Sequence, residues 1–248
     1  MGMSNSEFAV TYVDHNGVRH VCSLDEASHL PLTSFHPVRV VSSYKGQPNM
    51  PGLYWFATTA EHVLYESRRE MRALMMLDFD SDVIGVVAQP FVLVYTGGND
   101  SKKRSHVPDY FASRLDAPKR LVDVKPPKAA DKPDVKRVFD ATREACGIAG
   151  WDYEVVTGHA PTLLANVEWL ASYRRPPALL DDTAPVIVEA ASGGRSIEDL
   201  AGVFRSGIHE ALVRPVVMHL LWKRILDTDL SVPLTDSSIV TGGDGSGR

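Results

Sequence analysis

The sequence of 248 residues has two cysteines, Cys22 and Cys146, and no apolar run of about 18 residues, the length that suggests a membrane-spanning helix. Two cysteines cannot form the disulfide framework of a small secreted domain, and no group of cysteine and histidine residues has zinc-binding spacing. The N-terminus has no basic region followed by an apolar stretch, so the sequence predicts no signal peptide. We therefore expect a cytoplasmic protein that does not span a membrane.

An overall positive charge is also missing, because the formal net charge at pH 7 is −5. Proteins that bind nucleic acid contact phosphates through lysine and arginine, but the distribution of charge matters more than its sum. Residues 102–137 contain eleven basic and five acidic residues, whereas residues 176–248 contain six basic and ten acidic ones. The first segment is therefore the candidate for phosphate contact, and the second suits protein binding better.

The length allows one core of ordinary size and a small second domain. The double proline Pro176-Pro177 marks the expected boundary between them. We predict a strand-rich extension over residues 1–50, an α/β domain over 51–175 that holds the main core, a small helical or winged-helix-like domain over 176–240, and a disordered polar tail over 241–248.

Alternation of period two predicts strands, and apolar spacing of three and four residues predicts helices. The expected strands span residues 8–13, 18–22, 38–41, 107–111, 121–125, 151–157, 186–189 and 230–234. The expected helices span residues 59–77, 131–150 with an end at Gly147, 161–175, a segment that begins at Ser196, and 208–226. Strand, helix and strand from residue 121 onward predict an α/β fold, a mixed sheet flanked by helices.

The strand predicted at residues 121–125 has charged side chains on one face. Side chains alternate along a strand, so Asp123 and Lys125 lie on the same face, roughly 7 Å apart at about 3.3 Å per residue. Val122 and Val124 lie on the other face and anchor the strand in the core. A carboxylate and an ammonium group are thus placed side by side.

Two further carboxylates complete the candidate site. Asp109 follows Pro108 in the preceding strand, and the short connection predicts an antiparallel pair in which Asp109 faces Asp123. Glu70 lies on the helix predicted at 59–77, one turn after Glu66.

These residue types suit phosphodiester hydrolysis. A catalyst must neutralise the phosphate and activate a water molecule, and a divalent metal does both. Mg²⁺ prefers oxygen ligands, which Glu70, Asp109 and Asp123 supply, with the carbonyl of Val124 as a further ligand. Lys125 would orient or deprotonate the attacking water, or offset charge in the transition state. We expect Mg²⁺ as the cofactor, with Mn²⁺ as a substitute, and double-stranded DNA as the substrate.

Two polar residues near these motifs are assigned differently. Gln89 interrupts an apolar run, and a buried amide needs hydrogen-bond partners, so we expect it to support the site without direct catalysis. His106 lies two residues before Pro108 and is more typical of a partly exposed structural residue. It is left outside the predicted site.

Several short blocks occur along the chain in a fixed order, namely Tyr65-Glu66-Ser67-Arg68-Arg69-Glu70, Leu77-Asp78-Phe79-Asp80, Val83, Gln89-Pro90-Phe91, His106-Val107-Pro108-Asp109-Tyr110 and Asp123-Val124-Lys125. This series resembles the TnsA-type transposon endonucleases, members of the restriction-endonuclease-like PD-(D/E)xK superfamily. The resemblance covers roughly residues 50 to 175. It implies that Glu70, and not Glu66, is the metal ligand on the helix. It also implies DNA cleavage at transposon ends, together with a partner transposase and an ATPase regulator.

Other interpretations remain open at this stage. Each motif residue taken singly fits a turn, an exposed strand face or a solvated helix as well as it fits a site. The same site would serve a restriction or repair nuclease unrelated to transposition. A non-catalytic DNA- or protein-binding module of the same fold is the alternative from another class.

Overall fold

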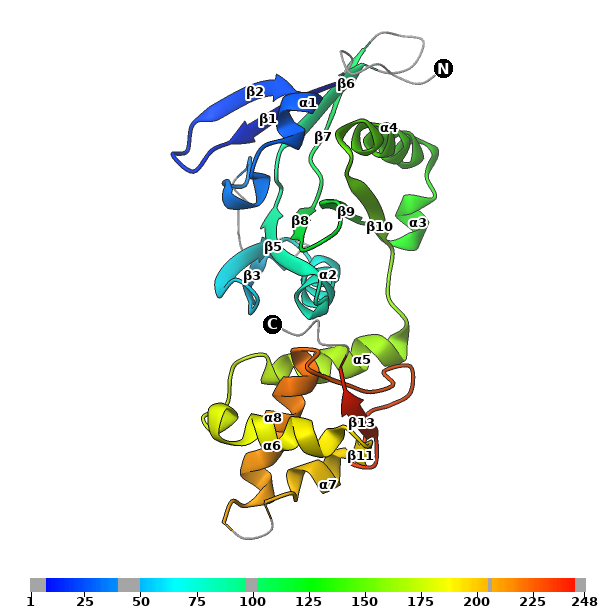
Figure 1. Cartoon of the computed structure of the whole chain (residues 1–248). Coiled ribbons are helices and arrows are strands. Elements are labelled where there is room, and N and C mark those ends of the chain that lie inside the picture. The colour runs from blue at the N-terminus through cyan, green and yellow to red at the C-terminus, as the bar shows by residue number, and fades with distance from the viewer. Residues whose placement is uncertain (1–7, 40–49, 97–101, 205–206, 244–248) are drawn as a thin grey trace. The chain divides into compact units, whose positions relative to one another are not determined.

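The computed structural model describes residues 8–39, 50–96, 102–204 and 207–243, and it divides the chain into two compact units. The first unit comprises residues up to 74 and 82–158, and the second comprises residues 75–81 and 159 onward. This division falls earlier in the chain than the expected boundary at Pro176-Pro177. Figure 1 shows the elements of both units.

The first unit is a mixed α/β structure, which confirms the predicted fold class. One sheet is antiparallel, with the order β2-β1-β6-β7. The other is mixed, with the order β10-β9-β8-β5, and a separate hairpin pairs β3 with β4. Its strands are β1 (Phe8–Val13), β2 (Arg19–Ser23), β3 (Gly52–Phe56), β4 (Glu61–Tyr65), β5 (Val83–Ala88), β6 (Val92–Thr96), β7 (Lys103–His106), β8 (Tyr110–Arg114), β9 (Arg120–Val124) and β10 (Asp152–Val156). Its helices are α1 (Leu24–Ser28), η2 (Leu32–Ser34), α3 (Pro127–Ala130), α4 (Pro133–Ala149) and the first part of α2 (Arg68–Phe79), whose residues from Met75 onward belong to the second unit.

Helix α4 joins β9 to its parallel neighbour β10, as the predicted strand, helix and strand required. The helix lies beside β10 in Figure 1. It ends at Gly150 in the left-handed conformation, φ 69°, and not at Gly147, because Gly150 is the residue that adopts the positive φ of a helix C-cap. A buried cluster that includes Phe91, Phe111 and Trp151 also contains residues of β9 and α4, so it packs these two elements together.

The N-terminal strands are confirmed, with Gly17 at φ 78° in the turn between β1 and β2. They do not form a separate extension, because β1 pairs with β6 inside the first unit. The strand expected at 38–41 lies partly outside the described residues, and Val38 itself belongs to no strand. The strand expected at 107–111 begins only at Tyr110, since Pro108 has no N–H for the ladder.

The helix predicted at 59–77 is wrong in its first turns. Residues 61–65 form β4, and the helix begins only at Arg68. The alternation of His62, Val63, Leu64 and Tyr65 fits a strand, and Ser67 then provides the helix start. Glu66 therefore precedes the helix and does not lie on it.

The second unit contains α5 (Pro161–Leu170), η3 (Ala171–Tyr173), α6 (Leu180–Ala191), β11 (Arg195–Ser196), α7 (Ile197–Ala201), α8 (Glu210–Trp222), β12 (Leu226–Asp227) and β13 (Ile239–Gly242). The last three strands form a sheet of order β11-β13-β12. From α6 onward the order is helix, strand, two helices and two strands, which is compatible with the winged-helix-like arrangement expected here. No helix among the described residues is long and apolar enough to cross a membrane.

Three expectations for this region are wrong. Residues 186–189 belong to α6, because Thr183, Ile187 and Ala191 are buried at helical spacing. Residues 230–234 form a loop, since the side chain of Asn166 bonds to three main-chain groups there, at 2.8–3.0 Å. Residues 241 and 242 lie in β13 and not in a disordered tail, while 244–248 lie outside the described residues.

Candidate active site

Asp109 and Lys125 are placed at the ends of paired strands. Asp109 immediately precedes β8, and Lys125 immediately follows β9, the antiparallel neighbour of β8. Oδ2 of Asp109 accepts a hydrogen bond of 2.6 Å from the N–H of Val124 and contacts Nζ of Lys125 at 3.3 Å. The N–H of Lys125 in turn donates to the carbonyl of Val156 on β10, at 3.0 Å. The two residues therefore share one fixed position at the edge of the sheet.

The pKa of the Asp109 carboxyl group is shifted in opposite directions by its surroundings. Its side chain is only 13% exposed. Burial raises the pKa of Asp109, the nearby Lys125 ammonium lowers it, and the charge of Asp123 raises it again. The net effect is a raised pKa, because the Lys125 ammonium does not fully offset burial and the charge of Asp123. A bound cation would favour the charged form of the carboxyl group.

Asp123 is fully buried and held by two side chains. Nε2 of His106 lies 2.8 and 2.9 Å from its two carboxylate oxygens, and the hydroxyl of Tyr153 donates to Oδ2 at 2.6 Å. Sequence reasoning left His106 outside the site and did not consider Tyr153. The register of β9 and β10 explains the second contact, because Tyr153 is paired with Leu121, two residues before Asp123 on the same face.

Glu70 occupies the first turn of α2, and its carboxylate caps the helix. The group accepts hydrogen bonds from the N–H of Glu66 at 2.7 Å and from the hydroxyl of Ser67 at 2.9 Å. The Ser67 hydroxyl in turn accepts from the N–H of Glu70, as in a capping box. Burial raises the pKa of Glu70, the Glu66 N–H lowers it, and the charge of Asp109 raises it further. Glu70 and Asp109 therefore interact electrostatically.

Gln89 forms hydrogen bonds with both Asp109 and Glu66. Its N–H donates to the carbonyl of Asp109 at 2.9 Å, and its side-chain amide donates to Oε1 of Glu66, which Arg39 also contacts. The residue is 4% exposed and adopts a positive φ of 49°, which is rare for a residue other than glycine. This agrees with the expectation that Gln89 supports the site.

The donor set around Asp109 has the chemistry that a hard divalent cation prefers, since it consists of carboxylate oxygens whose pKa values are raised first by burial and then by their mutual repulsion. No group of three or more His, Cys, Asp and Glu side chains among the described residues is arranged to hold a metal ion. Glu70 is engaged in its helix cap and Asp123 in its bonds to His106 and Tyr153. The side chains thus fit the cation by type, and their roles as ligands remain predictions.

The basic residues of segment 102–137 divide into paired and exposed groups. Arg114 contacts Asp152 at 2.7 Å, Arg120 contacts Glu154 at 3.5 Å, and Lys136 contacts Asp131 at 3.1 Å. These ion pairs reduce the charge excess counted from the sequence. Lys128 on α3 and Lys132, which follows it, are exposed and lie in the chain close to Lys125. They are the better candidates for phosphate contact.

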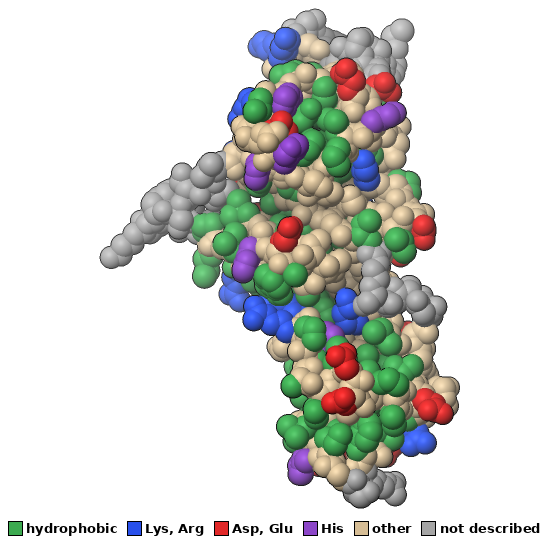
Figure 2. Space-filling model, turned by 60° about the vertical axis from the view of Figure 1, so that its left-hand side comes forward, with side chains coloured by type: hydrophobic (Ala, Val, Ile, Leu, Met, Phe, Trp, Pro, Cys, Tyr) green, Lys and Arg blue, Asp and Glu red, His purple; other side chains and the backbone are tan. Residues whose placement is uncertain are grey.

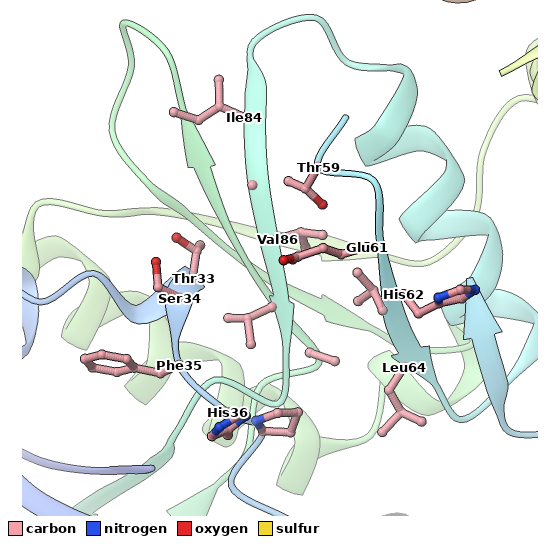
Figure 3. A pocket seen from close by; sticks show the side chains of 15 residues that line it. Thr33, Ser34, Phe35, His36, Thr59, Glu61, His62, Leu64, Ile84 and Val86 are labelled. Carbon is pink, nitrogen blue, oxygen red and sulfur yellow. The ribbon is translucent and has the colours of Figure 1, made fainter. Parts of the chain in front are cut away.

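A separate pocket of about 530 Å³ lies along β5, between η2 and β4. Figure 3 shows Thr33 and Ser34 on one side of it, and Thr59 and Glu61 on the other. Glu61 is the only carboxylate among the described residues that line it, and none of the predicted site residues does so. The pocket is therefore distinct from the candidate active site.

The comparisons with known proteins bear on one part of the chain. Residues 80–158 match the family model described as the TnsA-like endonuclease N terminal. The match confirms the resemblance to TnsA-type endonucleases and supports a nuclease of the transposase family. It contains Asp109, Asp123 and Lys125, whereas Glu70 lies before its first residue. No curated protein matches the chain.

Proposed function

We propose that the protein is a Mg²⁺-dependent DNA endonuclease subunit of a heteromeric transposase, which hydrolyses phosphodiester bonds at transposon ends. The observation that carries the proposal is the buried Asp109 carboxylate beside Lys125, at the ends of two paired strands in the segment that matches the endonuclease family. Mn²⁺ is expected to replace Mg²⁺, because both accept carboxylate oxygens.

When bound, the divalent cation supplies charge neutralisation at the phosphate and lowers the pKa of water. Asp109, Asp123 and Glu70 would hold it, with the Val124 carbonyl as a further oxygen ligand. The main chain around Asp109 is fixed by Gln89, and its carboxylate is fixed by the N–H of Val124. The carboxylate is therefore already ordered, and it loses little conformational entropy when it binds the cation.

Lys125 would act on the reacting groups. Its Nζ donates to Oδ2 of Asp109, and the strand end holds its main chain through Val156. An ammonium group here would stabilise the negative charge that grows on the phosphate oxygens as water attacks phosphorus and the bond to the leaving oxygen breaks. The side chain is 33% exposed, so DNA can reach it.

The second unit is proposed to bind protein partners, namely a transposase and an ATPase regulator. Helix α8 would be the recognition helix of a DNA-binding winged helix, but Val213 and residues 216–222 on it are buried. Its first turn exposes Glu210 and Leu212, an acidic and an apolar side chain that suit protein binding better than phosphate contact. Hydrophobic and acidic side chains are visible on one face of this unit in Figure 2.

The proposal is tested by incubating the purified protein with Mn²⁺ or Mg²⁺ and supercoiled plasmid carrying transposon ends, with and without the candidate transposase. We expect nicks that disappear with EDTA and in Lys125→Ala, and that persist in the control Lys136→Ala, which replaces an exposed lysine paired with Asp131. Metal-dependent cutting of any plasmid without ends or partner would favour the restriction or repair nuclease. No cleavage in any combination, with Mn²⁺ binding also absent, would favour a non-catalytic module.

A further inference from the structure

Asp123 is tied to two strands besides its own, and both contacts come from side chains outside the predicted motif. His106 is the last residue of β7 in one sheet, and Tyr153 lies on β10 in the other. Their donors lie 2.6–2.9 Å from the carboxylate, and Asp123 itself is 0% exposed. A buried carboxylate with this many close donors has a fixed orientation.

The number of donors limits what Asp123 can still bind. A carboxylate only accepts, and each oxygen has two lone-pair positions. Among the described residues, Oδ2 accepts the hydroxyl hydrogen of Tyr153, and the single hydrogen on Nε2 of His106 is shared between Oδ2 and Oδ1. Oδ1 accepts only that shared hydrogen, so it is the oxygen with more capacity to bind a cation.

The hydroxyl of Tyr153 is a reliable donor in this setting. Its oxygen lies 2.6 Å from Oδ2 of Asp123, and the hydroxyl proton lies between the two oxygens at this distance. The ring is held by packing as well, because Tyr153 contacts Phe139 edge-on and Arg143 lies over its face, both on α4. The donor therefore cannot turn away without disturbing α4.

We propose that Tyr153 and His106 are positioning residues that hold Asp123 so that it offers one oxygen, Oδ1, to the divalent cation as a monodentate ligand. This inference rests on the proposed function. It adds that the geometry of the third ligand is set by β7 and β10, outside the Asp-x-Lys motif itself. In many metal sites, residues that hydrogen-bond to a ligating side chain fix its orientation, and their loss lowers metal affinity about 10–100-fold.

A purely structural role for the same network makes a different prediction. His106 and Tyr153 would then serve only to neutralise a buried carboxylate that links the two sheets. Their substitution would lower the unfolding temperature of the metal-free protein and leave the affinity of the folded protein for metal unchanged. Metal affinity separates the two roles, because stability falls in both.

The test is a calorimetric titration of the full-length protein with Mn²⁺. We expect Tyr153→Phe, which keeps the ring and removes the donor, to weaken binding at least tenfold. Tyr12→Phe, which removes a phenol elsewhere in the first unit, should bind like the wild type. His106→Gln, whose amide nitrogen replaces Nε2, should bind within about threefold of the wild type, whereas His106→Ala should lose affinity as Tyr153→Phe does.

The outcomes separate this proposal from the proposed function. If Asp109→Ala loses Mn²⁺ binding while folded Tyr153→Phe and His106→Ala bind like the wild type, the positioning role is overturned and the nuclease site stands. If wild type and Asp109→Ala bind Mn²⁺ equally, the proposed function itself fails. Should Tyr153→Phe not fold, the comparison of His106→Ala with His106→Gln decides the question by the same criterion.

Discussion

The N–H of Val124 donates a 2.6 Å hydrogen bond to the carboxylate of Asp109, across the point where β8 begins and β9 ends. The main chain of one motif thus holds the side chain of the other. This bond explains why Asp109 contacts Lys125, and why it does so from just outside the ladder that pairs Tyr110 with Val122.

Replacing Asp109 by Asn should keep the fold while removing the charge. Asn retains an oxygen that can accept from Val124, and the raised pKa of Asp109 means that the folded protein disfavours the charged form at neutral pH. We expect the metal-free Asp109→Asn protein to unfold at the same temperature as the wild type or higher, measured by circular dichroism in EDTA. A clear fall in that temperature would contradict the electrostatic description of the site.

The two roles of Glu70, cap and ligand, can be separated by substitution. Ser67→Ala removes the cap hydroxyl and keeps the carboxylate, so it should cost about 1 kcal/mol of stability and leave cleavage nearly unchanged. Glu70→Gln keeps an acceptor for the Glu66 N–H and removes the charge, so it should preserve stability and abolish cleavage. Equal cleavage by Glu70→Gln and wild type would remove Glu70 from the site.

Gln89 stores backbone strain, which glycine would relieve. Its φ of 49° costs a non-glycine residue on the order of 1 kcal/mol, and both Ala and Gly lose the bond to Glu66. Gln89→Gly should therefore unfold at higher denaturant concentration than Gln89→Ala, with both below the wild type. The reverse order of the two variants in a urea titration would show that this backbone position is not strained.

Acid should weaken the second unit through His219. The side chain is 4% exposed and Nδ1 contacts the carbonyl of Tyr173 at 2.7 Å. Burial lowers the pKa of His219 below its ordinary value of 6.5, with Lys223 acting in the same direction. A lowered pKa means stability that is complete above pH 6.5 and is lost as pH falls toward the folded value.

The measurement is urea unfolding followed by tryptophan fluorescence between pH 7.5 and 5, since Trp222 is buried in this unit beside Phe79. His219→Asn, which keeps a donor for Tyr173 and cannot titrate, is the matched control. Its stability should vary less with pH than that of the wild type. Parallel curves for the two proteins would mean that another group causes the acid sensitivity.

Much of the first unit could be predicted from the sequence, because its signals are local. The hairpin at Gly17, the strand that carries Asp123 and the helix that follows it have strong alternation, helical spacing or turn residues. The start of α2 was predicted too early because residues 59–65 contain apolar residues that fit both periods. The decisive signal was the cap at Ser67.

The motif residues of the candidate site could be predicted from the sequence, but the residues that hold them in place could not. Asp109 and Lys125 come together because the strand pairing predicted for them forms. The contact of His106 with Asp123 joins two different sheets, and no spacing in one sequence indicates which strands of two sheets meet. Likewise, the loop at 230–234 depends on Asn166, more than sixty residues away in the chain.

The proposed activity depends on Asp109, which would hold the cation that cleavage requires. The most direct measurement is the initial rate of plasmid nicking in Mn²⁺ by wild type and by Asp109→Asn, with the transposase present and with both proteins shown to be folded. We predict that the variant nicks at least about a hundredfold more slowly than the wild type, the typical effect of losing a group that stabilises the transition state. Nicking by Asp109→Asn at the wild-type rate would contradict it.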